Sequence, residues 1–136
     1  MIAYYMVEKL TATICIEFSP SKKTIVDTVK SLTKKGLINI DYKYLKEILS
    51  NNQIKLINLT TPKRVSSVEL NELVKVLDTQ SKKFIVDISG GSSLTLSEVE
   101  KVIDLVTQKT PDAYIMFGAH ILPKLKNSRK IVLITN

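Results

Sequence analysis

The sequence is poor in the residue types that most often carry chemistry or covalent cross-links. It has no tryptophan, one histidine (His120), one cysteine (Cys15) and four glycines among 136 residues. A single cysteine excludes an intramolecular disulfide, and no Cys/His cluster exists that could hold zinc. Cys15 lies between two isoleucines, so we expect a buried structural thiol in a reducing, cytoplasmic setting.

Long hydrophobic runs are also missing. The longest apolar stretch, residues 113–122, is far shorter than the roughly 20 residues that a membrane helix needs. The first ten residues lack the basic segment that opens a secretory leader. We therefore expect no leader peptide and no membrane contact.

The charge is strongly of one sign, with a formal net charge of +7. The 20 basic residues are dispersed along the chain, which is typical of a lysine-rich solvated surface. The tyrosines and phenylalanines do not interleave with basic residues as they do in single-strand binders. A basic nucleic-acid-binding adaptor domain is the alternative function, and any such binding is expected to be weak and non-specific.

Apolar periodicity and capping residues predict a single α/β domain over residues 1–136. Strands are predicted over residues 11–18, 54–59, 83–89, 113–121 and 130–135. Helices are predicted after Ser19-Pro20-Ser21, after Asp41, and at the capping boxes that begin at Ser66 and Thr95. Gly36 is the expected C′ residue of the first helix.

The alternation of strands and helices favours βαβ units. We expect a mixed, mostly parallel four- to five-stranded sheet with packed helices. The last strand is expected to run antiparallel to its predecessor, because the connection between them is too short for a helical crossover. Whether the helices cover one face or two stays open, and residues 1–20 form an extra N-terminal strand segment of uncertain placement.

No motif supplies an active site. The pair Gly90-Gly91 separates a strand from a helix, but the phosphate-binding glycine patterns are absent, so a turn that needs positive φ is the preferred interpretation over an anion site. His120 is expected to be structural. No carboxylate pair suggests acid–base catalysis. The residues therefore predict no catalytic group, no cofactor and no metal.

Three stretches resemble the FtsZ/tubulin family. GLINIDYKYLKEIL (residues 36–49) is similar to the FtsZ synergy loop, G-L-I-N-[LV]-D-F-A-D. DISGGSSLTLSEVEKVIDLV (residues 87–106) is similar to N-I-S-G-G-x-D-L-T-L-x-E-V, and PDAYIMFGAHI (residues 111–121) to D-[AP]-x-A-x-I-I-F-G-A. The order and spacing agree over roughly residues 22–136, which is more specific than one short motif.

The resemblance implies the fold of the family's C-terminal domain, without the GTPase domain and its G-G-G-T-G-[ST]-G loop. It implies a non-catalytic interaction module that regulates or caps a tubulin-like filament in cell division or the cytoskeleton. The partner would be a full-length FtsZ/tubulin-like relative or a second copy.

By the same resemblance, Asn39 and Asp41 match polar positions of the synergy loop, and Tyr44 stands where FtsZ has an acidic residue. A tyrosine cannot replace a carboxylate at neutral pH. We therefore expect Asn39, Asp41, Tyr42 and Tyr44 to be exposed and to form a protein contact. The alternative for Asn39 and Asp41 is a loop residue and a helix cap without a partner, and for the tyrosines it is packing against the chain's own core.

Overall fold

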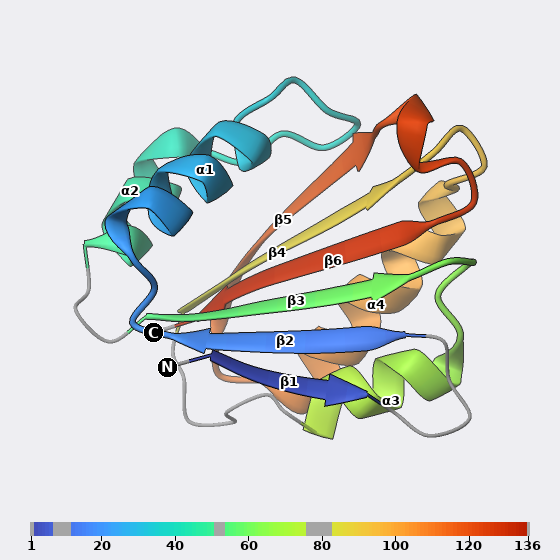
Figure 1. Cartoon of the computed structure of the whole chain (residues 1–136), viewed down its shortest axis with the longest axis horizontal. Coiled ribbons are helices and arrows are strands. Elements are labelled where there is room, and N and C mark those ends of the chain that lie inside the picture. The colour runs from blue at the N-terminus through green and yellow to red at the C-terminus, as the bar shows by residue number, and fades with distance from the viewer. Residues whose placement is uncertain (1, 7–11, 51–53, 76–82, 136) are drawn as a thin grey trace.

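The computed structural model describes residues 2–6, 12–50, 54–75 and 83–135. These residues form a single sheet with helices packed on it (Figure 1). In chain order the elements are β1 (Ile2–Met6), β2 (Thr13–Phe18), α1 (Lys22–Leu32), α2 (Tyr42–Leu49), β3 (Lys55–Thr61), α3 (Ser67–Lys75), β4 (Lys83–Gly90), α4 (Leu96–Lys109), β5 (Tyr114–Ile121), a 3₁₀ turn (Pro123–Leu125) and β6 (Arg129–Thr135).

The sheet is mixed, as predicted, but it has six described strands and is mostly antiparallel. The strand order is β1-β2-β3-β6-β4-β5, and β4–β5 is the one parallel pair among the described strands. The prediction of a mostly parallel sheet was wrong because β6 inserts between β3 and β4 and pairs antiparallel with both. A continuous apolar run such as Ile131–Ile134 is buried on both faces, which favours a central position.

Helices cover both faces of the sheet, which settles the point that the sequence left open. On one face, α1 and α2 bury a cluster that includes Leu32, Leu45 and Ile48 against Ile85 and Ile134 of the sheet. On the other face, α3 and α4 cover a larger cluster. Figure 1 shows the α1–α2 layer on the opposite side of the strands from α3 and α4.

The N-terminal strands extend this sheet rather than forming a separate unit. β1 pairs with β2, and β2 pairs with β3, both antiparallel. Residue 11, where the predicted strand begins, lies outside the described residues. Side chains alternate between buried and half-buried along β2, and Cys15 falls on the half-buried side. The prediction of a buried Cys15 was therefore wrong, because alternation along a strand turns it away from the core.

Three of the four predicted helix caps accept a backbone hydrogen bond, and at the fourth the Glu69 carboxylate accepts one from the Ser66 N–H. The side chains of Ser21, Asp41 and Thr95 each accept a hydrogen bond from a backbone N–H in the first turn of α1, α2 and α4. The C-terminus of α1 differs from the prediction, because the helix ends at Leu32 and is capped by Thr33 rather than by Gly36. Within the described part of the chain, no helix has the length and apolar character of a membrane span.

Candidate functional site

The loop between α1 and α2 is fixed to the sheet. Ile38 and Ala119 of β5 form an isolated antiparallel bridge, with N–O distances of 3.1 Å and 3.0 Å. Inside the loop, the Asn39 side-chain oxygen accepts a hydrogen bond of 2.8 Å from the Gly36 N–H. The loop is therefore held at its centre by backbone hydrogen bonds to an edge strand, which gives its exposed side chains a defined position.

A buried histidine supports this loop from beneath. His120 on β5 places Nδ1 2.7 Å from an Asp87 carboxylate oxygen and Nε2 2.8 Å from the Lys34 carbonyl oxygen. Both neighbours are acceptors, so only the doubly protonated ring satisfies both. The hydrogen bond to Asp87 raises the pKa of His120, and burial opposes that shift without reversing it. The sequence interpretation of His120 as structural left its partner Asp87 unidentified.

Gly36 has to be a glycine because Ala119 and His120 of β5 lie directly against it. A Cβ at this position would overlap the Ala119 carbonyl oxygen and lie 2.6 Å from a carbon of the His120 ring. Its φ is not positive, so the requirement comes from close approach and not from backbone conformation.

The anchoring of the loop should depend on pH. The folded-state pKa of His120 lies above its ordinary value of 6.5, so its stabilisation is fully present below that value and is lost as the pH rises through the folded pKa. His120 is the only histidine, so an NMR titration of its ring reports this pKa without overlap. Asp87→Asn is expected to return the pKa towards or below 6.5. Titration of the wild-type ring below its ordinary pKa would contradict the account.

Three of the four predicted contact residues are exposed and one is not. Asn39 and Asp41 are exposed, and Tyr42 is 58% exposed. Tyr44 is only 8% exposed, and its hydroxyl donates a 3.0 Å hydrogen bond to the Tyr114 carbonyl oxygen. The expected exposure of Tyr44 was wrong, because it lies two residues after Tyr42 and so faces the sheet.

The burial of Tyr44 also defines its chemistry. Its ring packs on Tyr114 with 4.8 Å between the ring centroids. Burial raises the pKa of Tyr44 to about 12, so the hydroxyl stays protonated at neutral pH. Tyr44 therefore holds the first turn of α2 against β5, as the alternative interpretation required.

Comparisons with known proteins agree with this geometry. Residues 71–136 match the model of the FtsZ family, C-terminal domain. Cell division protein FtsZ 1 of Archaeoglobus fulgidus is 28% identical over 131 residues, covering 88% of this chain. A solved structure, an empty FtsZ dimer from M. jannaschii, superposes with a TM-score of 0.64 at 26% identity, over 82% of this chain and 35% of that one.

The chain carries an FtsZ-family C-terminal domain. FtsZ of Methanothermobacter thermautotrophicus is another relative, 31% identical over 104 residues that cover 71% of this chain and 27% of the relative. The chain spans about a third of the length of such relatives, since it covers 36% of the Archaeoglobus protein. The match to the family therefore concerns this domain.

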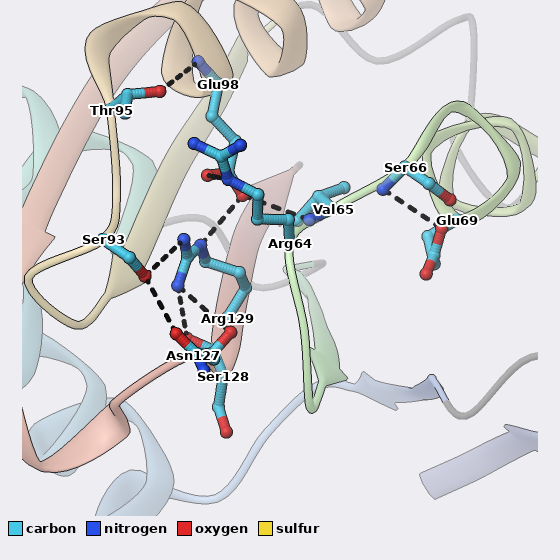
Figure 2. A network of polar contacts seen from close by, with 10 residues as sticks. All are labelled: Arg64, Val65, Ser66, Glu69, Ser93, Thr95, Glu98, Asn127, Ser128 and Arg129. Carbon is cyan, nitrogen blue, oxygen red and sulfur yellow. Dashed lines mark hydrogen bonds and ion pairs between the residues drawn. The ribbon is translucent and has the colours of Figure 1, made fainter.

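A buried ion pair holds the other end of the FtsZ-family domain together (Figure 2). Arg129 at the start of β6 donates from Nε to the Glu98 carboxylate of α4 at 2.8 Å, and both side chains are buried. The same carboxylate oxygen accepts a 3.1 Å hydrogen bond from the Val65 N–H. The pair thereby ties α4, β6 and the β3–α3 connection into one unit.

The remaining donors of Arg129 are also used. Nη2 donates to the Ser93 hydroxyl at 3.1 Å, and Nη1 donates to the carbonyl oxygens of Asn127 and Ser128 at 3.2 Å and 3.1 Å. The second Glu98 oxygen has no hydrogen bond within the described residues and lies 3.9 Å from Nε of the exposed Arg64. The network orders the loops on both sides of β6 and leaves Arg64 loosely held.

Sequence reasoning missed this network because Glu98 fits a second role. The Thr95 hydroxyl does accept from the Glu98 N–H at 3.3 Å, as a capping box requires. The Glu98 side chain turns to Arg129 instead of returning to Thr95. The available signal was Arg129 itself, an arginine two residues before the apolar run Ile131–Ile134, whose charge needs a partner if it is buried.

The glycine pair next to this network has a steric explanation. Neither Gly90 nor Gly91 has a positive φ, so the predicted positive-φ turn was wrong. A Cβ on Gly91 would overlap the Lys126 carbonyl oxygen, and one on Gly90 would lie 2.9 Å from the Arg129 side chain. The pair lets the Pro123–Ser128 connection pass close to the end of β4.

Proposed function

We propose that this FtsZ-family domain is an assembly module that docks on a tubulin-like filament subunit through its α1–α2 loop. In this role it regulates or caps filament growth in cell division. The observation that carries the proposal is a loop with exposed Asn39, Asp41 and Tyr42 that is anchored from below by Ala119 and His120. A pre-ordered loop loses little conformational entropy when it binds.

The proposed contact is non-catalytic. The resemblance to the synergy loop extends to Asn39 and Asp41, but Tyr44 stands in place of the acidic residue. Its hydroxyl is occupied by the Tyr114 carbonyl oxygen and is protonated at neutral pH. Such a group cannot orient or deprotonate an attacking water as a carboxylate does.

The test is an assembly assay with full-length FtsZ from the chain's own organism. Wild-type chain added to polymerising FtsZ is expected to reduce light scattering at low molar ratios, as a capping factor does. Tyr42→Ala should weaken the effect about tenfold or more, because exposed tyrosines are frequent interface hot spots. The exposed ring makes little contact with the core, so the melting temperature should stay nearly unchanged.

Asp41→Asn separates contact from folding in the same assay. Asparagine caps helices as well as aspartate does, so α2 is retained while the charge is removed. The matched control is Leu96→Ala on α4, a residue that is also exposed but lies on the helix that covers the other face of the sheet. Equal activity of wild type and Tyr42→Ala, or no effect of the wild-type chain on assembly, would contradict the proposal.

A further inference from the structure

We propose that a groove between α1 and α2 docks an acidic amphipathic segment of a partner protein. The groove has a volume of about 260 Å³ and lies beside the α1–α2 loop. Its lining comes from one residue of α1, from one face of α2 and from the residue that caps the end of α2: Val29, Tyr42, Leu45, Lys46, Leu49 and Ser50. The inference rests on the proposed function in one respect: the groove adjoins the proposed contact loop, and the inference names the class of partner that would bind there.

The floor of the groove is apolar. Leu45 is fully buried, Val29 and Leu49 are half-buried, and Tyr42 stands exposed at the rim. Val26 precedes Val29 by three residues on the same helix face and is 42% exposed. Pockets for drug-sized ligands run from roughly 300 to 1,000 Å³. This smaller groove therefore suits a protruding apolar side chain better than a free small molecule.

The rim of the groove is basic. Residues 22–50 contain seven lysines and three carboxylates. Lys46 lines the groove, and Lys30 follows Val26 by four residues on the same face of α1. Neither lysine forms an ion pair within the described part of the chain.

The carboxylates of this region do not neutralise the rim. Glu47 pairs with Lys83 at the start of β4, and Asp41 caps α2 through the Lys43 N–H. The third carboxylate, Asp27 of α1, lines a different cavity. No acidic residue lines the groove. An apolar floor with unpaired lysines beside it complements a helix that carries apolar anchors at i, i+3, i+4 and i+7 and carboxylates next to them.

Charge and shape favour an acidic protein segment over a second copy of the chain or an RNA as the molecule that binds the groove. A second copy of the chain would bring the same lysine-rich surface, and like charges facing each other across an interface are costly. RNA would be attracted by the lysines but would not need the apolar floor, since phosphate neutralisation carries non-specific binding. The combination of both features favours an acidic protein segment.

The probe is a fluorescein-labelled synthetic helical peptide with leucines at i, i+3, i+4 and i+7 and glutamates between them. Fluorescence anisotropy is expected to detect binding to the wild-type chain. Lys46→Glu should weaken it about three- to tenfold, because one favourable charge pair becomes repulsive. The matched control is Lys109→Glu, which also changes a lysine in the last turn of a helix but on α4. It should bind the peptide as the wild type does.

A second peptide tests the apolar floor. Serine in place of the four leucines is expected to abolish measurable binding. The proposal is overturned if this peptide or single-stranded RNA binds as tightly as the leucine peptide, or if Lys46→Glu and Lys109→Glu behave alike. It is also overturned if sedimentation velocity shows a dimer that Lys46→Glu dissociates. This assay contains no FtsZ, so a failure to bind the peptide would overturn the groove proposal and leave the outcome of the filament assembly assay unaffected.

Discussion

Replacement of Arg129 by methionine is expected to lower the free energy of unfolding by about 3–5 kcal/mol, because it leaves the Glu98 carboxylate buried without its cation. Arg129 is 1% exposed and Glu98 is 7% exposed, so water cannot take over the lost interaction. The hydrogen bonds to Ser93, Asn127 and Ser128 are lost at the same time. Urea unfolding followed by circular dichroism measures the effect.

Two controls separate the ion pair from packing. The double variant Arg129→Met/Glu98→Gln removes both charges and should recover part of the loss, since no uncompensated charge is then left buried. Arg64→Met changes the other arginine near the Glu98 carboxylate, and the Arg64 side chain is 64% exposed. It should cost no more than about 1 kcal/mol. An Arg129→Met variant as stable as Arg64→Met would contradict the assignment.

Replacement of His120 by leucine is expected to lower the free energy of unfolding by about 3–5 kcal/mol at a pH where the ring is charged, because it leaves the Asp87 carboxylate buried without its cation. Asp87 is 2% exposed and would lose its cation; among the described residues it would keep the 3.2 Å hydrogen bond from Ser89. The Lys34 carbonyl oxygen would lose its donor. The α1–α2 loop should also become more mobile. Amide hydrogen exchange at Ile38 should accelerate, because the hydrogen bond from Ile38 to Ala119 lies next to the substituted residue.

The double variant His120→Leu/Asp87→Asn removes the stranded charge. It should regain part of the stability, while exchange at Ile38 stays fast because the contact to Lys34 is still missing. Unchanged protection of the Ile38 amide in His120→Leu would show that the bridge to Ala119 holds the loop without the histidine.

Local rules predicted most of the elements from the sequence. Ser21, Asp41 and Thr95 act as helix caps as expected, since capping depends on residues within one turn. The strand order was not accessible in this way, because the insertion of β6 between β3 and β4 depends on long-range pairing. The parallel pairing of β4 and β5 follows the βαβ rule.

The sequence predicted the exposed residues of the candidate site but not the long-range contacts that support them. The resemblance to the FtsZ synergy loop pointed to Asn39, Asp41, Tyr42 and Tyr44 as exposed residues, but Tyr44 turns inward because it packs on Tyr114, 70 residues away. His120 and Asp87 are 33 residues apart and meet only because β4 and β5 pair in register. Contacts of this kind carry no local sequence pattern.

Site-specific photocrosslinking from position 42 tests the central claim most directly. A benzophenone amino acid replaces Tyr42, whose side chain is exposed at the start of α2, and the chain is mixed with assembling full-length FtsZ from its own organism. The account predicts a cross-linked product with FtsZ that is absent when the same group replaces the exposed Leu96 of α4. Cross-linking of equal yield from both positions, or from neither, would contradict a docking role for the α1–α2 loop.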